Sequence, residues 1–133
     1  MYLLDSCTIS DFMKGHTNTM KKIKNTSPSL IYTMTITQTE IMFGLLRKFD
    51  NSHYYYKMFE DFLLAITVLP FDAKAAIQSA VIKKNLESRG NIIGAYDILI
   101  AGIAKAASLT LITSDIKEFE RIDDLKLANW RDQ

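Results

Sequence analysis

Four acidic residues follow short apolar segments, at the points where each segment gives way to the next. Carboxylates are the oxygen ligands that Mg²⁺ and Mn²⁺ prefer, and a cluster of them is costly unless a cation compensates the charge. An open α/β sheet gathers the carboxyl ends of its strands into one crevice, so segments that share a sheet would bring these side chains together. The residues are Asp5, Glu40, Asp97 and Asp115.

The chemistry that suits such a cluster is attack by water on a phosphodiester bond. A divalent ion lowers the pKa of its bound water and neutralises the charge that develops on the phosphate oxygens. No side-chain nucleophile is then needed, and the sequence offers no convincing one, because Cys7 is its only cysteine. We therefore expect a metal-dependent hydrolase of phosphate esters, with a ribonuclease as the leading candidate and Cys7 as a small buried residue.

Each acidic residue also has a structural explanation that involves no ligand. Thr37 and Glu40 have the spacing of a capping box, and Asp5 and Asp115 can cap the helices that follow them. Asp97 lies in the first turn of its helix, where the helix dipole favours an anion. Capping is the favoured interpretation of each acidic residue taken alone. The presence of all four together favours a metal-binding site.

The elements that must position these residues alternate between strands and helices. This alternation is typical of a parallel sheet covered by helices on both faces. Asp72 precedes one of the helices, and a cap of that helix and a supporting role at the site are both open. The helix over 94–107 is rich in Gly and Ala, so we expect it to pack closely against the sheet. We expect strands at 1–4, 30–36, 67–69, 109–113 and 126–128, and helices at 6–14, 17–25, 37–48, 52–66, 73–87 and 94–107.

Length and composition limit the class of protein. A chain of 133 residues with 48% hydrophobic side chains is expected to form one globular domain. Its net charge of +1 is not that of a general nucleic-acid binder, so any such contact must come from a local basic patch or from a metal ion that bridges phosphate. The sequence has no basic leader and no apolar run of the ~20 residues of a membrane span, so we expect a cytoplasmic protein.

At its acidic segments the chain resembles the PIN-domain family, and within it the VapC-type toxins of bacterial toxin–antitoxin modules. Each matching motif is weak alone, but four in this order at these spacings are a strong signal, and the resemblance extends over essentially the whole chain. One departure is Cys7, which stands where the family usually carries Asn or a similar polar residue. The matching segments are Leu3–Cys7, Thr35–Gly44, Asp97–Gly102 and Leu111–Phe119, with Leu125–Trp130 similar to the family's C-terminus.

The resemblance implies a PIN-like three-layer α/β/α sandwich around a parallel, roughly five-stranded sheet. It also implies a Mg²⁺- or Mn²⁺-dependent endoribonuclease of the bacterial cytoplasm. Such an enzyme would cut a structured RNA such as tRNA and thereby inhibit translation and growth.

The same resemblance implies roles for the acidic residues. Asp5 and Asp97 would be the principal metal ligands, and Glu40 would complete the site and help to orient the attacking water. Asp115 matches a position where members carry Asp or Asn, and it would be the fourth catalytic and metal-binding residue. Supporting contacts would come from Thr113, Ser6 and Asp72.

Partners are also implied by the resemblance. A VapB-type antitoxin would cover the active-site groove and insert a basic side chain among the carboxylates, because Arg can replace the charge of the cation. Operator DNA would be contacted indirectly through the antitoxin, and the chain would form a homodimer. The aromatic residues between Tyr54 and Phe62 exceed what one helix face can bury. We expect about half of them in the core and the others at the antitoxin groove or the dimer surface.

Two other classes of protein remain open. A catalytically inactive PIN-like interaction module would require the loss of an acidic residue, and Asp5, Glu40 and Asp97 are all present. A Mg²⁺-binding phosphatase-like or receiver-like domain would require a phosphorylatable Asp after a mid-chain strand and a Lys near the last strand. The sequence shows neither clearly.

Overall fold

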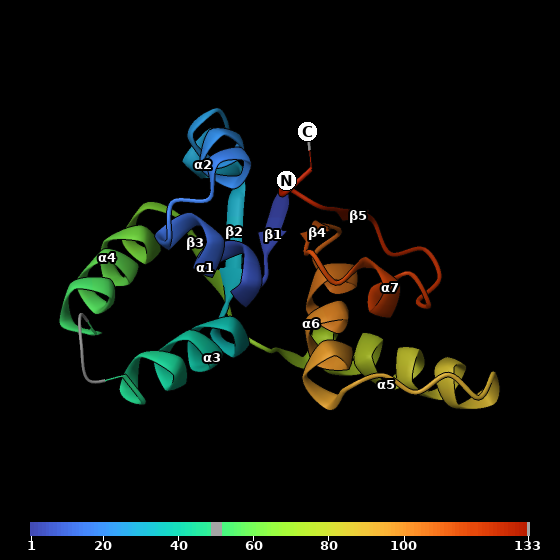
Figure 1. Cartoon of the computed structure of the whole chain (residues 1–133). Coiled ribbons are helices and arrows are strands. Elements are labelled where there is room, and N and C mark those ends of the chain that lie inside the picture. The colour runs from blue at the N-terminus through green and yellow to red at the C-terminus, as the bar shows by residue number, and fades with distance from the viewer. Residues whose placement is uncertain (49–51, 133) are drawn as a thin grey trace.

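A parallel five-stranded sheet forms the centre of the molecule (Figure 1). The computed structural model describes residues 1–48 and 52–132. The strand order is β3-β2-β1-β4-β5, and every neighbouring pair is parallel, which confirms the predicted sheet. The strands are β1 (Tyr2–Leu4), β2 (Ile31–Met34), β3 (Thr67–Leu69), β4 (Thr110–Ile112) and β5 (Leu127–Ala128).

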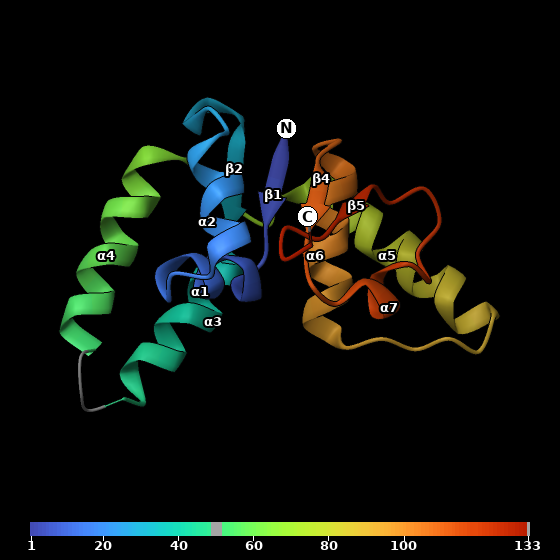
Figure 2. The ribbon, with the colours of Figure 1, turned by 45° about the horizontal axis from the view of Figure 1, so that its top comes forward.

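Helices cover both faces of this sheet. In the two views of the ribbon, α1 to α4 lie on one side of the strands and α5 to α7 on the other (Figures 1 and 2), so the predicted three-layer sandwich is confirmed. No helix in the described part of the chain is long and apolar enough to cross a membrane. The helices are α1 (Ser6–Met13), α2 (Thr17–Lys24), α3 (Thr35–Leu46), α4 (Ser52–Ala65), α5 (Ala73–Ser88), α6 (Ala95–Ala106) and α7 (Ile116–Phe119), with a 3₁₀ turn at Pro28–Leu30.

Alternate residues of the strands enter two separate cores. Leu3 packs into the core beneath α5 and α6, whereas its neighbour Leu4 packs into the core beneath α1, α2 and α4, as strand periodicity requires. Phe59 and Phe62 of α4 are buried in the second core, while Tyr54 on the same helix is 59% exposed. The predicted division of this aromatic helix between core and surface is therefore confirmed.

The central strand β1 lies at the point where the strand order reverses. The chain passes from β1 to β2 and β3 in one direction, then returns to β4 on the opposite edge of β1. Asp5 follows β1 and Thr113 follows β4, and the Asp5 amide donates a hydrogen bond to the Ile112 carbonyl at 3.2 Å. Both residues thus stand at the crevice where open α/β sheets bind their ligands.

Helix α3 begins at Thr35, two residues earlier than predicted, and β2 ends at Met34. Met34 occupies the N-cap position without a side-chain hydrogen bond, so the capping box predicted for Thr37 and Glu40 is wrong. Glu40 lies in the second turn of the helix instead. The Glu40 carboxylate is therefore not needed to cap the N-terminus of α3.

The Gly- and Ala-rich helix α6 makes its closest approach to α5, whereas the sequence predicted this approach to the sheet. A Cβ atom at Gly102 would overlap the Ser79 Oγ atom and lie 2.8 Å from the Ala75 carbonyl oxygen. Ser79 in turn donates a hydrogen bond to the Ile98 carbonyl at 3.4 Å. Gly102 thus sets the spacing between the helix that carries Asp97 and its neighbour.

Replacing Gly102 by Ala is expected to lower the free energy of unfolding by about 1–3 kcal/mol, because the added methyl group has no space. Gly44→Ala in α3 is the matched control, since no atom lies within 4 Å of a Cβ built there. That change is expected to raise stability by about 0.5–1 kcal/mol, as Ala favours a helix interior over Gly. Urea unfolding measures both, and equal stability of the two variants would contradict the role of Gly102.

Candidate active site

Asp5 stands at the carboxyl end of the central strand and caps α1. Its Oδ1 atom accepts a hydrogen bond from the Thr8 amide at 2.9 Å, and the residue is only 7% exposed. Burial raises the pKa of Asp5, while hydrogen bonds from the Thr113 side chain and from Thr8 lower it. The predicted capping is therefore present, and it coexists with a position at the switch point of the sheet.

Thr113 connects the ends of the two central strands. Its buried Oγ1 atom accepts a hydrogen bond from the Asp115 amide at 3.0 Å, and its side chain is hydrogen-bonded to Asp5. Asp115 occupies the N-cap position of α7, yet its carboxylate makes no capping hydrogen bond. The capping role predicted for Asp115 is therefore wrong, and its charge acts on the site instead.

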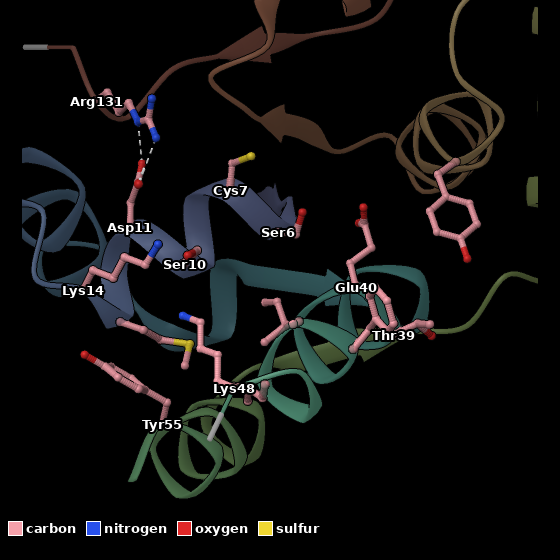
Figure 3. Close-up of a pocket in the computed structure, with 16 residues that line it drawn as sticks. Ser6, Cys7, Ser10, Asp11, Lys14, Thr39, Glu40, Lys48, Tyr55 and Arg131 are labelled. Carbon is pink, nitrogen blue, oxygen red and sulfur yellow. Dashed lines mark hydrogen bonds and ion pairs between the residues drawn. The ribbon is translucent and has the colours of Figure 1, made fainter. Parts of the chain in front are cut away.

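Glu40 projects from α3 toward Ser6 at the start of α1 (Figure 3). Burial raises the pKa of Glu40, a hydrogen bond from Ser6 lowers it, and the charges of Asp5 and Asp97 raise it further. The Oε1 atom is buried and has no hydrogen-bond partner among residues 1–48 and 52–132. Because an unpaired buried oxygen is costly, this atom fits a cation or a donor that a ligand supplies.

Asp97 reaches the same region from α6, on the other face of the sheet. Burial raises the pKa of Asp97, and the nearby charges of Asp115, Glu118 and Asp5 raise it further. Like charges that disfavour one another's ionised form are the mark of gathered carboxylates. Glu118, whose ion pair with Arg121 is long at 3.9 Å, was not predicted as part of the site. The available signal was its place three residues after Asp115, on the same side of a helical turn.

Asp72 lies apart from these carboxylates. It follows the edge strand β3 and caps α5, where its Oδ1 atom accepts a hydrogen bond from the Ala75 amide at 2.9 Å. Asp72 is not among the charges that raise the pKa of Asp5, Glu40 or Asp97. Of the two interpretations left open for this residue, capping accounts for what the structure shows.

A groove of about 860 Å³ runs between α1 and α3 and has Glu40 and Ser6 at one end. Much of its wall is apolar or aromatic, with Phe43, Tyr55 and Tyr96 among the lining residues. Cys7 also lines the groove and is exposed, so its predicted burial is wrong. The groove therefore opens beside the acidic cluster at Glu40.

The donor set suits a hard divalent cation that keeps much of its water. No three Asp, Glu, His or Cys side chains of the described residues are arranged to hold a metal ion by themselves. Mg²⁺ is usually bound through one or two carboxylates, several waters and the phosphates of a substrate, so a complete protein cage is not required. The all-oxygen donors and the unpaired Oε1 of Glu40 are what such a hydrated ion needs.

Comparisons with known proteins agree with this geometry. The model of the PIN domain matches residues 2–125. The tRNA(fMet)-specific endonuclease VapC of Salmonella typhimurium is 28% identical over 129 residues, which cover 97% of each chain. Ribonuclease VapC2 of Haemophilus influenzae is 30% identical over 129 residues, again 97% of each chain. The chain therefore belongs to the PIN-domain family, and within it to the VapC-type toxins of toxin–antitoxin modules.

Solved structures show the same arrangement of strands and helices. The DNA-bound VapBC complex of Salmonella typhimurium contains a chain that is 28% identical, with 97% of each chain covered and a TM-score of 0.88. A chain of the FitAcB structure from Neisseria gonorrhoeae is 26% identical over the full length of both, with a TM-score of 0.92. The fold of this chain is therefore shared with the matched chains of both structures.

Proposed function

We propose that this chain is a metal-dependent endoribonuclease, the toxin of a VapBC-type module, and that its substrate is a structured RNA such as tRNA. The observation that carries the proposal is the convergence of Asp5, Glu40 and Asp97 from three elements at the switch point of the sheet. Relatives named as ribonucleases, one of them specific for tRNA(fMet), support the activity and the substrate class. Cleavage of such an RNA inhibits translation and growth.

The acidic side chains have two roles in this proposal: Asp5 and Asp97 would bind a cation, and Glu40 would accept a proton. Asp5 and Asp97 would hold Mg²⁺ or Mn²⁺, and Asp115 adds negative charge beside Asp97. The ion, when bound, makes water more acidic and neutralises phosphate charge. Glu40 orients the attacking water and accepts its proton at Oε1, since burial raises the pKa of this carboxyl toward the range of a useful base. Ser6 holds the Glu40 side chain in place.

A VapB-type antitoxin occupies the groove and excludes RNA from it. The solved VapBC complexes support this partner, and so do the apolar wall and acidic end of the groove. A basic side chain of the antitoxin compensates the carboxylates in place of the cation. Contact with operator DNA runs through the antitoxin, and a homodimer and a cytoplasmic location belong to the same proposal.

Purified protein is expected to cut a pool of total bacterial RNA into discrete products in Mg²⁺. EDTA is expected to abolish those products, and excess Mg²⁺ to restore them. Sequencing of the product ends identifies the RNA that is cut. Products that persist in EDTA would contradict a metal-dependent site. Absence of cleavage by folded protein would favour an inactive interaction module, and hydrolysis of p-nitrophenyl phosphate without RNA cleavage would favour a phosphatase.

A further inference from the structure

The groove beside the acidic cluster is bordered by two stripes of residues that repeat every four positions. Residues four apart lie on one face of a helix, so each stripe runs along the groove wall. The stripe of α1 starts at the Ser6 hydroxyl, and the stripe of α3 starts at the Glu40 carboxylate, which projects toward Ser6 (Figure 3). The two stripes are Ser6, Ser10 and Lys14 on α1, and Glu40, Gly44 and Lys48 on α3 and the residues just after it.

Both stripes end in a lysine. Lys14 and Lys48 line the same groove, and Figure 3 shows their ammonium groups directed into it from the two walls. Eight residues of helix rise about 12 Å, so Lys14, the C-cap of α1, and Lys48, two residues after the end of α3, lie roughly that far along the groove from Ser6 and Glu40. The groove thus has an acidic end at the site and a basic end two helical turns away.

Among the described residues, the two lysines are absent from the ion pairs that hold the other charges of the groove. Arg131, the third cation of the groove, is held by both oxygens of Asp11, at 2.6 and 3.0 Å. Neither Lys14 nor Lys48 forms an ion pair within the described ranges, 1–48 and 52–132. Both lie at the C-terminal ends of helices, where a cation also complements the helix dipole. That role alone does not require both side chains to enter one groove.

We propose that Lys14 and Lys48 form a phosphate-binding subsite for the RNA backbone, a few nucleotides away from the bond that is cut. The proposal rests on the ribonuclease function proposed above. Phosphate contacts position a nucleic acid, and paired lysines are its ordinary partners. A chain with net charge +1 and an acidic active site needs local cations to bring a polyanion to the metal.

Other features of the groove suit a nucleic-acid strand. Ser10 lies between Ser6 and Lys14 on the α1 stripe and offers a hydroxyl to a phosphate oxygen. Gly44, opposite, leaves open space where another residue would place a side chain. Phe43 and Tyr96 are 58% and 52% exposed, and such rings stack on bases; the Arg47 guanidinium already lies 4.7 Å from the centroid of the Phe43 ring. Phosphates on the lysines and bases on the aromatic wall would place the strand along the groove toward Glu40.

The test compares two variants that lose the same charge. Lys14→Gln with Lys48→Gln removes the subsite, and Lys83→Gln with Lys84→Gln removes two exposed lysines of α5, beyond the opposite face of the sheet. Binding of labelled total tRNA is measured over a range of salt concentrations, in an Asp97→Asn background that leaves the RNA uncut. The groove variant is expected to bind about tenfold more weakly, with a salt slope reduced by about 1–2 units. The α5 variant is expected to keep most of its affinity for tRNA and most of its salt slope.

Further readouts separate phosphate binding from a structural role. Lys14→Arg with Lys48→Arg is expected to restore binding, and in protein with an intact site the glutamine variant is expected to raise KM while kcat holds. An unchanged salt slope with lower stability in urea would overturn the subsite in favour of dipole compensation. Lost affinity for the antitoxin with full RNA binding would overturn it in favour of a protein contact. Wild-type protein that neither cuts nor binds RNA would refute the ribonuclease function itself.

Discussion

Asp97→Asn is expected to lower the rate of RNA cleavage at least about a hundredfold. Changes in residues that merely orient a metal ligand cost 10- to 100-fold, so loss of a ligand's charge should reach or exceed the upper value. Burial and the charges of Asp115, Glu118 and Asp5 all raise the pKa of Asp97, and a cation beside it would relieve this repulsion. Single-turnover cleavage at saturating Mg²⁺ measures the effect.

Asp72→Asn is the matched control for this experiment. Asp72 also follows a strand and begins a helix, but its carboxylate caps α5. Asn is as good an N-cap as Asp, so the variant is expected to keep both its stability and its activity. Equal losses of activity in Asp72→Asn and Asp97→Asn would show that the catalytic cluster has been placed wrongly. Circular dichroism of both proteins checks that the fold is intact.

Mg²⁺ is expected to stabilise the folded protein by about 2.7 kcal/mol when its concentration is a hundred times its Kd. The physical reason is the repulsion among Asp5, Glu40 and Asp97, which a cation relieves. Thermal unfolding with and without the ion measures this effect. Asp5→Asn and Asp97→Asn should respond much less, and an undiminished response would mean that the ion binds elsewhere.

In EDTA, Asp5, Glu40 and Asp97 are expected to stabilise the folded protein increasingly as the pH falls toward their ordinary pKa values. Burial raises the pKa of Asp5, Glu40 and Asp97 above ordinary values of 3.8 for Asp and 4.5 for Glu, so the folded state holds these protons more tightly than the unfolded state. Their contribution is complete below the ordinary pKa and is lost as pH rises through the raised one. The effect of Mg²⁺ should therefore fade at acidic pH. Stability in EDTA that falls steadily from neutral pH would contradict this linkage.

The order of strands and helices could be predicted because each strand is a short apolar run bounded by turn residues. The residue at which α3 begins could not be predicted in the same way. Thr35 and Ile36 are a β-branched pair that continues the pattern of β2, and the wrong boundary then suggested a cap for Glu40. The helix begins at Thr35 in the folded molecule, which shows that local propensity is a weak guide at an element boundary.

Residues that act through tertiary proximity were the hardest to find. Asp5 and Asp115 could be found because they follow the strands β1 and β4, whereas Glu40 and Asp97 lie within α3 and α6 and were found by their place beside apolar segments. The catalytic roles of all four stay predictions. Glu118, Lys14 and Lys48 were missed as site residues, since their roles depend on which helices face each other across a groove. Cys7 was expected to be buried, but the face of α1 that carries it turns toward that groove.

The pairing of the central strand has a consequence for how the chain acquires activity. Tyr2 in β1 pairs with Thr110 in β4, so the strands that border the crevice come from far ends of the described chain. Such non-local pairing slows folding. Asp5 and Asp115 meet only in a molecule in which β1 and β4 have paired. A half-folded or broken molecule of this toxin carries no assembled nuclease, so its danger to the cell arises only when folding is complete.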